Sequence, residues 1–146
     1  MKIIICDDEL FARQQIKEAI QKYPSHYPLE IYEFDSGEKM LGKLKEQHID
    51  MIFLDIEMDK IDGIDTAKLI RINDRKAIII FVSSHQERVF DSFDCEAFHF
   101  ITKPFTQEKF NDVFTKAMEK YQFLKKNLII KWKNESISLP IQRIKF

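Results

Sequence analysis

Ile3-Ile4-Ile5-Cys6-Asp7-Asp8, at the start of the chain, is an apolar run that ends in two adjacent carboxylates. Three later segments have the same form, an apolar run followed by a reactive polar residue: Met51-Ile52-Phe53-Leu54-Asp55, Ile79-Ile80-Phe81-Val82-Ser83 and Phe100-Ile101-Thr102-Lys103-Pro104. A buried strand of a parallel sheet reads as such a continuous apolar run. In open α/β sheets the site lies outside the carboxyl ends of the strands. The sequence therefore predicts a cleft that gathers three carboxylates, a hydroxyl and an ammonium group.

Strand and helix signals alternate along the first 125 residues. Apolar runs predict strands over residues 2–6, 29–34, 50–54, 77–82 and 98–102. Apolar residues spaced three and four positions apart predict helices near residues 9–22, 36–47, 63–73, 86–94 and 106–125. Alternating strands and helices predict a parallel sheet with right-handed crossovers. Five strands favour an α/β, flavodoxin-like (βα)5 fold with the strand order 2-1-3-4-5.

The pattern changes after about residue 126. Residues 128–133 form a β-like run, residues 133–136 read as a turn, and residues 137–140 alternate like a returning strand. A single hairpin cannot bury a core of its own. The sequence therefore predicts one domain over residues 1–125. Over residues 126–146 it predicts a linker and a short carboxyl-terminal β segment that begins a second, incomplete domain.

Composition excludes several classes of protein. With 146 residues and 45% apolar residues, the chain is long enough for one globular core and little more. A net charge of -1 means that binding to nucleic acid would need a local basic patch. No apolar run reaches the length of a membrane span, and acids follow too early for a signal peptide. Cys6 and Cys95 have no metal spacing and are expected to be small buried hydrophobes. We expect a cytoplasmic protein without a membrane partner.

The acidic residues of the predicted cleft indicate a magnesium site. Asp7 or Asp8 could cap the following helix, but capping explains only one acid. Mg²⁺ prefers oxygen ligands and keeps several waters, so one carboxylate can bind directly and its neighbour through water. Asp55 beside this pair would be repelled, and a divalent cation would relieve the repulsion and leave Asp55 an ionised nucleophile. Glu57 can add its backbone carbonyl to the ligands.

Two further residues of the cleft suit phosphoryl transfer onto a carboxylate. Ser83 can donate its hydroxyl to an incoming phosphoryl oxygen, although a lone serine after a strand is usually structural. Lys103 can place a point charge on a phosphoryl oxygen, although the commonest fate of a lysine is a solvated surface. Phosphoryl transfer mainly needs such positioning and charge neutralisation. The four histidines form no metal or catalytic spacing.

In this order and at these spacings, the motifs resemble the receiver domains of two-component response regulators. The resemblance covers residues 1 to about 122 and rests on Ile5-Cys6-Asp7-Asp8-Glu9, Leu54-Asp55-Ile56-Glu57-Met58, Asp62-Gly63, Phe81-Val82-Ser83-Ser84 and Lys103-Pro104-Phe105. It implies that Asp55 accepts a phosphoryl group from a phosphohistidine of a sensor histidine kinase. It also implies that Mg²⁺ is held by Asp7, Asp8, Asp55 and the backbone carbonyl of Glu57.

The same resemblance implies how the domain switches. Ser83 and Phe100 match the switch hydroxyl and the switch aromatic residue, and Lys103 matches the lysine of the site. Such a protein is a phosphoacceptor with at most slow autocatalytic phosphorylation and dephosphorylation, not an enzyme with turnover, and on phosphorylation it forms a homodimer through residues 86–122. Three residues depart from the family pattern: Asp59 stands where proline is common, Ser83 replaces threonine, and Phe100 replaces tyrosine.

The last part of the chain resembles the opening of a LytTR-type DNA-binding domain, in the pattern Leu128-Ile129-Ile130 followed by Ile137-Ser138-Leu139-Pro140-Ile141-Gln142-Arg143-Ile144. This resemblance implies a transcription regulator of the LytR/AgrA-like family that binds DNA only with its complete second domain. Two alternatives stay open on the sequence alone. One is a stand-alone receiver that acts as a protein-binding module. The other is a haloacid-dehalogenase-like phosphatase, although that family places its nucleophile first and its paired acids last.

Overall fold

The structure, a computed structural model, describes the backbone of residues 1–138 and the side chains of residues 1–127. Its strands are β1 (Lys2–Cys6), β2 (Glu30–Phe34), β3 (Met51–Leu54), β4 (Ile78–Ser83) and β5 (His99–Thr102). Its helices are α1 (Leu10–Lys22), α2 (Gly37–Glu46), α3 (Gly63–Asn73), the 3-10 helix η1 (Gln86–Cys95) and α4 (Gln107–Ser138). Among the described residues, no helix is both long and apolar enough to cross a membrane.

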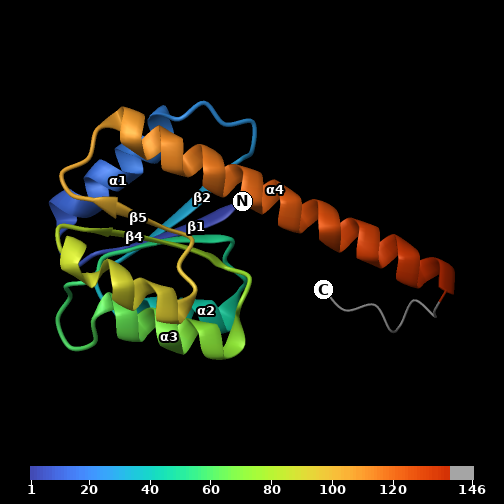
Figure 1. The fold of residues 1–146 in the computed structure, drawn as a ribbon, viewed down its shortest axis with the longest axis horizontal. Coiled ribbons are helices and arrows are strands. Elements are labelled where there is room, and N and C mark those ends of the chain that lie inside the picture. Colours follow the sequence, from blue (N-terminus) through green and yellow to red (C-terminus); the bar gives the residue numbers. More distant parts are fainter. Residues whose placement is uncertain (139–146) are drawn as a thin grey trace.

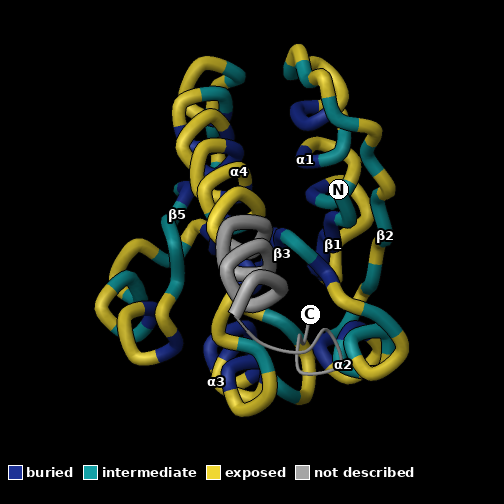
Figure 2. The backbone as a smooth tube through the Cα atoms, turned by 90° about the vertical axis from the view of Figure 1, so that its right-hand side faces the viewer, coloured by how far each residue is buried: buried dark blue, intermediate teal, exposed yellow. Residues whose placement is uncertain are grey.

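The five strands form one parallel sheet in the order β2-β1-β3-β4-β5, which confirms the predicted fold class and strand order. Helices α1 and α4 cover one face of the sheet, whereas α2, α3 and η1 lie on the other (Figure 1). The central strands β1, β3 and β4 are almost wholly buried because helices cover them on both sides (Figure 2). Their continuous apolar runs are what such burial requires.

Two hydrophobic cores, one on each face, hold the helices to the sheet. On the α1 and α4 face, alternate strand residues such as Ile3 and Phe53 pack with Phe110 and Phe114. Phe53 and Phe110 stack with ring centroids 5.5 Å apart. On the opposite face, the intervening strand residues pack with Met40 of α2 and with apolar residues of α3. Side chains alternate between the two faces of a strand, so each strand contributes to both cores.

Polar residues fix where three of the helices begin. Ser36 accepts a hydrogen bond from the backbone N–H of Lys39 at the start of α2, and Thr106 accepts one from Lys109 before α4. Asp62 caps α3 in the same way. Such caps satisfy backbone donors that the first turn of a helix leaves free.

Two predicted elements differ in the structure. The helix expected over residues 86–94 is η1, a 3-10 helix. The prediction of a β-like run over residues 128–133 is wrong, because α4 continues without a break to Ser138. A hairpin without a core is marginal, whereas each residue added to an existing helix gains a backbone hydrogen bond. The end of the expected returning strand, residues 139–140, lies outside the described residues, and the domain division near residue 125 stays a prediction.

Candidate functional site

The register of the sheet brings the predicted acids together at the carboxyl ends of β1 and β3. Cys6 pairs with Leu54, so Asp7 and Asp55 follow on neighbouring strands. The backbone N–H of Asp55 donates to the carbonyl of Cys6 at 3.0 Å, which extends the pairing by one residue. One oxygen from each of Asp7, Asp8 and Asp55 lies within 4.8 Å of the others. The predicted acidic cleft is therefore present.

The three acids have different surroundings. Asp7 is fully buried, and both of its oxygens are engaged: Oδ1 accepts from the backbone N–H of Glu9 at 2.9 Å and Oδ2 from Nζ of Lys103 at 2.7 Å. Asp55 is 7% exposed, and Asp8 is exposed to solvent. Each of the three acids offers one carboxylate oxygen to a cation, and the carboxylate of Asp7 already accepts two hydrogen bonds.

Burial and mutual repulsion disfavour negative charge in this cleft. Burial, followed by the charge of Asp7, raises the pKa of Asp55 to about 6, although Lys103 opposes the rise. Desolvation and the charge of Asp7 also raise the pKa of Asp8. A divalent cation would lower both pKa values because it stabilises the carboxylate forms. The donor set, hard oxygens with one open side, fits Mg²⁺.

Lys103 lies between the two buried acids. Its Nζ is 2.7 Å from Oδ2 of Asp7 and 3.6 Å from Oδ1 of Asp55. Burial alone would lower the pKa of Lys103, but the hydrogen bond to Asp7 and the charge of Asp55 outweigh burial and raise it. The ammonium group therefore stays charged at the edge of the carboxylate that the sequence marks as the nucleophile.

Ser83 and Phe100 lie on the strands beyond β3. Ser83 ends β4, is fully buried, and its Oγ accepts a hydrogen bond from the backbone N–H of His85 at 3.2 Å. Phe100, on β5, is partly buried, with its ring centroid 6.4 Å from that of Phe81. Phe100 also lines a groove of about 450 Å³ between η1 and β5. Their roles as a switch pair stay a prediction.

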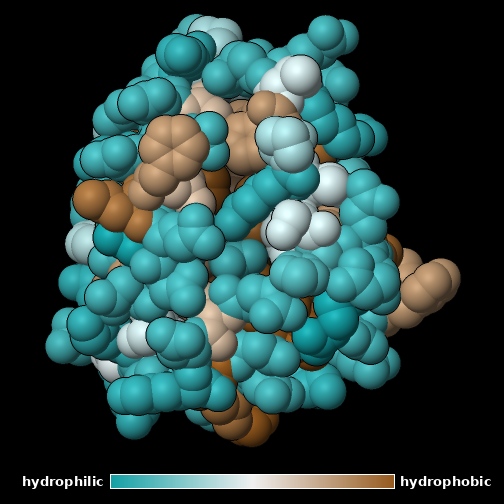
Figure 3. All heavy atoms as spheres, turned by 90° about the vertical axis from the view of Figure 1, so that its left-hand side faces the viewer, coloured by the Kyte–Doolittle hydropathy of each residue, from teal (hydrophilic) through white to brown (hydrophobic). Residues whose placement is uncertain are grey.

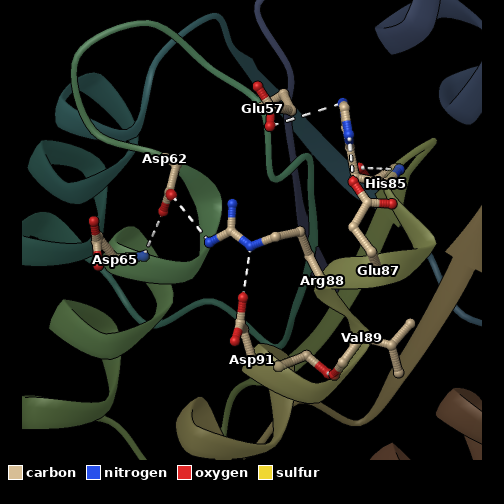
Figure 4. Close-up of polar contacts among 10 residues, drawn as sticks. Glu57, Asp62, Asp65, His85, Glu87, Arg88, Val89 and Asp91 are labelled. Atoms are coloured by element: carbon tan, nitrogen blue, oxygen red, sulfur yellow. Dashed lines mark hydrogen bonds and ion pairs between the residues drawn. The ribbon is translucent and has the colours of Figure 1, made fainter.

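The side chain of Glu57 lies near His85 and is not one of the three carboxylates of the acid cluster. Its Oε1 lies 3.8 Å from Nε2 of His85, whose Nδ1 contacts Glu87 at 3.0 Å (Figure 4). The sequence assigned to the metal the backbone carbonyl of Glu57 and not its side chain. The metal role of that carbonyl stays a prediction.

Two residues that support the site were not singled out as such from the sequence. Arg13, one turn into α1, donates from Nη1 to the backbone carbonyl of Asp7 at 2.7 Å. Gly63, the first residue of α3, lies so close to Asp55 that a Cβ atom would be 2.0 Å from its carbonyl oxygen. Only Gly63 has a sequence signal, as part of the Asp62-Gly63 motif. An arginine in the first turns of an exposed helix carries no comparable signal.

The face at the carboxyl ends of the strands is largely hydrophilic, with a few apolar groups among its polar side chains (Figure 3). Two of the large exposed apolar residues, Leu10 and Phe11, begin α1 two residues after the acid pair and are 58% and 69% exposed. The acid cluster thus opens toward solvent beside a small apolar surface.

Comparison with known sequences finds a matching family model and several related bacterial proteins. The family model described as the response regulator receiver domain matches residues 3–115. The transcriptional regulatory protein YpdB of Escherichia coli is 32% identical over 123 residues, 84% of this chain and 49% of YpdB. The sensory transduction protein LytR of Staphylococcus epidermidis is 34% identical over 117 residues, 80% of this chain and 46% of LytR. The chain thus spans about half the length of the curated relatives it matches.

Solved structures agree with the sequence relatives. The response regulatory domain of protein MrkE from Klebsiella pneumoniae superposes with a TM-score of 0.76 at 32% identity, covering 84% of this chain and 98% of that one. The response regulator TrrA from Thermotoga maritima, solved with Mg²⁺ and beryllofluoride, gives a TM-score of 0.70 at 28% identity, covering 80% and 97%. The chain belongs to the response regulator receiver domains, the phosphorelay modules of two-component systems.

Proposed function

We propose that Asp55 is the phosphoacceptor of this receiver and takes its phosphoryl group from a phosphohistidine of a sensor histidine kinase. The observation that carries the proposal is the position of Lys103, whose Nζ contacts both Asp7 and Asp55. Asp55 is buried beside Lys103, whereas both oxygens of Asp7 already accept hydrogen bonds. Receiver domains generally interact with sensor kinases, and their acidic pocket binds Mg²⁺.

We assign the metal to the oxygens of Asp8 and Asp55 and the backbone carbonyl of Glu57, with Asp7 acting through water and through its charge. This assignment is supported by the spacing of the three acids and by the raised pKa values of Asp8 and Asp55. Bound Mg²⁺ would supply positive charge to the phosphoryl oxygens and to the carboxylate that attacks.

Three residues of the chain have separate roles in the proposed phosphoryl transfer. An oxygen of Asp55 forms a bond to phosphorus while the bond from phosphorus to the imidazole nitrogen breaks, and the leaving imidazole takes up a proton. Lys103 neutralises charge on a phosphoryl oxygen, and the hydroxyl of Ser83 donates a hydrogen bond to another. Such positioning and neutralisation account for most of the catalysis of phosphoryl transfer. Slow loss of the phosphoryl group to water would reset the domain without making it an enzyme with turnover.

The wider role that we propose is control of transcription in the cytoplasm. YpdB is named a transcriptional regulatory protein, and the matched region covers about half of it. We propose that a LytTR-type DNA-binding domain is the output that the phosphorylated receiver controls, with phosphorylation favouring a homodimer through residues 86–122. The haloacid-dehalogenase alternative is not favoured, because the matched family is a receiver.

Labelling tests the assignment of Asp55. The protein is incubated with acetyl phosphate and Mg²⁺, and its intact mass is measured before and after. The wild-type protein is expected to gain one phosphoryl group, and Asp55→Asn is expected to gain none. The matched control is Asp112→Asn, which removes an exposed acid on α4 and should label like the wild type. Full labelling of Asp55→Asn would show that another residue is the acceptor.

A further inference from the structure

Helix η1 is unusual for its length. It runs over 10 residues, Gln86–Cys95, as a 3-10 helix, whereas runs of this geometry longer than three or four residues are uncommon and often mark a hinge or strain. It ends at Glu96, which adopts a left-handed conformation with φ 54. η1 also begins three residues after Ser83, the proposed switch residue, which ends β4.

The apolar residues of η1 fit an α-helix better than the conformation that they adopt. Val89, Phe90 and Phe93 have the spacing i, i+1 and i+4, which places all three on one face of an α-helix. A 3-10 helix has three residues per turn and separates them: Val89 shares a face with Ser92 and Cys95, and Phe90 with Phe93. As a result Ser92 and Cys95 are buried, while Phe90 and Phe93 are 79% and 66% exposed. Such a conflict between local pattern and structure is expected at functional or strained elements.

Contacts at its two ends tie η1 to α3 and the loop before it. Near its start, Nη2 of Arg88 lies 3.3 Å from Oδ2 of Asp62, the residue that caps α3 (Figure 4). At its end, the buried Arg71 of α3 donates to the carbonyls of Cys95 and Glu96, both at 2.8 Å. The eight residues from Arg88 to Cys95 span about 16 Å as a 3-10 helix but about 12 Å as an α-helix. Anchors at both ends therefore favour the longer form.

We propose that η1 is a two-state element: the ion pair of Arg88 with Asp62 holds it as a 3-10 helix, and loss of that pair lets it rewind as an α-helix that gathers Val89, Phe90 and Phe93 on one face. The merged apolar face borders the groove of about 450 Å³ between η1 and β5, which Val89 and Phe93 already line. Rewinding thus changes the outer surface beside Phe100 without moving the sheet.

We expect phosphorylation of Asp55 to trigger the change in η1; this step rests on the proposed function. Two routes lead from Asp55 to η1, one through the loop that holds Asp62 and one through Ser83. Asp62 lies in the loop that follows Asp55. A phosphoryl group on Asp55 would therefore act on the loop that positions Asp62 against Arg88. The hydroxyl of Ser83 accepts a hydrogen bond from the backbone N–H of His85, just before η1. If Ser83 turns to a phosphoryl oxygen, that hydrogen bond is lost and the start of η1 is released.

Nuclear magnetic resonance of the unphosphorylated, metal-free protein tests the two states directly. Asp62→Asn removes the ion pair and keeps the cap of α3, because asparagine caps a helix as well as aspartate does. Arg88→Gln removes the same pair from the other side, together with the pair of Arg88 with Asp91 inside η1, so Asp62→Asn is the cleaner of the two variants. In both variants, the amide chemical shifts of residues 86–95 should move along one line, which joins their values in the 3-10 and α-helical states. Contacts from Hα of residue i to the amide of residue i+4, which are specific to α-helix, should strengthen.

The expected change is about two- to fivefold in the ratio of α-helix to 3-10 helix, the effect of losing one partly exposed ion pair. The matched control is Lys39→Gln, which removes the exposed pair of Lys39 with Asp35 on α2 and should leave the shifts of η1 unchanged. Shifts of residues 86–95 that stay at the wild-type values in both variants, or that scatter off a line, would overturn the proposal. Loss of all helical contacts in η1 would also overturn it, because the pair would then merely hold the segment folded.

The trigger has a separate test. Beryllofluoride with Mg²⁺, a mimic of the phosphoryl group, should move the wild-type shifts of residues 86–95 along the same line as Asp62→Asn does. Movement in another direction would overturn the link to Asp55. Because the variants are measured without phosphorylation, failure of the two-state proposal leaves the assignment of Asp55 intact. Failure of the labelling experiment likewise leaves the two-state behaviour intact.

Discussion

Asp55 carries a charge that the folded protein disfavours when no cation is bound. Its folded pKa of about 6 lies above the ordinary value of 3.8. Between these values the folded state holds a proton that the unfolded state has released, so stability falls as the pH rises through this range. An acid paired with a cation has a lowered pKa, so its contribution to stability rises with pH. Bound Mg²⁺ would give Asp55 this opposite pH dependence.

Asp55→Asn should therefore stabilise the metal-free protein at pH 7, by an amount of up to about 3 kcal/mol, since each pKa unit corresponds to about 1.4 kcal/mol. The gain should shrink toward about pH 4, where the carboxyl is protonated in the folded state and half-protonated in the unfolded state. Urea unfolding of the wild type and of Asp55→Asn at both pH values, with a chelator present, measures the difference. Asp112→Asn, at an exposed acid on α4, serves as the control. A gain that is independent of pH would contradict the raised pKa of Asp55 as its cause.

Asp8 should be the metal ligand that is most easily removed without disturbing the fold, because it is exposed while Asp7 is buried. Asp8→Ala should weaken Mg²⁺ binding by more than about tenfold, the loss typical even of outer ligands. Isothermal calorimetry measures the affinity. Glu57→Gln is the matched control and should bind Mg²⁺ normally, since its side chain faces His85 and only its backbone carbonyl is assigned to the metal. Equal affinity in Asp8→Ala and the wild type would remove Asp8 from the site.

At the scale of elements, the start of α3 is pressed against the end of β3. The backbone N–H of Gly63 donates to the carbonyl of Ile56 at 2.8 Å. A Cβ atom on Gly63 would meet the carbonyl oxygen of Asp55 at 2.0 Å and Cα of Ile56 at 2.9 Å. Both neighbours are backbone atoms, so α3 itself would have to move. Glycine at this position allows the close approach that shapes the loop around Asp55.

Gly63→Ala should lower the free energy of unfolding by about 1 to 3 kcal/mol, as overpacking does, and should also slow labelling by acetyl phosphate. Gly42→Ala is the matched control: a Cβ atom there meets nothing within 4 Å, and Gly42 lies inside α2. That change should stabilise the protein by about 0.5 to 1 kcal/mol, because glycine is a poor helix former. Thermal unfolding compares the two. Equal stability of the two variants would contradict the close approach of Gly63 to Asp55.

At the scale of the whole molecule, the proposed phosphorylation site and the proposed output face lie on different parts of the sheet. The acid cluster lies at the carboxyl ends of the strands, while α4 runs along one face and continues beyond the sheet (Figure 1). The proposed output face, residues 86–122, joins these regions because it starts after Ser83 and includes β5 and the packed part of α4. A structural change that starts at Asp55 would therefore reach a partner on this face through β5 and α4.

Dimerisation through this face is expected to depend on beryllofluoride and Mg²⁺. Sedimentation velocity should show a monomer without them and a dimer with them. Phe90→Ser should weaken the dimer by about tenfold or more, the effect of losing one buried aromatic side chain. Phe123→Ser is the matched control, because Phe123 is 58% exposed but lies outside residues 86–122. A monomer in every condition would remove dimerisation from the proposed function.

The sequence by itself determined the fold class, the strand order and the residues of the acidic cleft. These follow from local properties: an apolar run marks a buried strand, and a polar residue after it lies at the carboxyl edge of a parallel sheet. Asp7, Asp8, Asp55 and Lys103 were all found in this way, and the structure brings them together. The caps Ser36 and Thr106 were predictable for the same reason, since a cap acts within three residues.

Only the tertiary structure decided how those residues are paired and where local patterns give way. The contact of Lys103 with Asp7 joins residues 96 positions apart, and Arg88 reaches Asp62 across 26 positions. Local sequence periodicity does not reveal such pairs. Tertiary anchors also turned an α-helical pattern into the 3-10 helix η1, and α4 continued through a run with strand propensity. In each case a long-range contact, or the lack of a partner strand among the described residues, outweighed a local preference of about 1 kcal/mol.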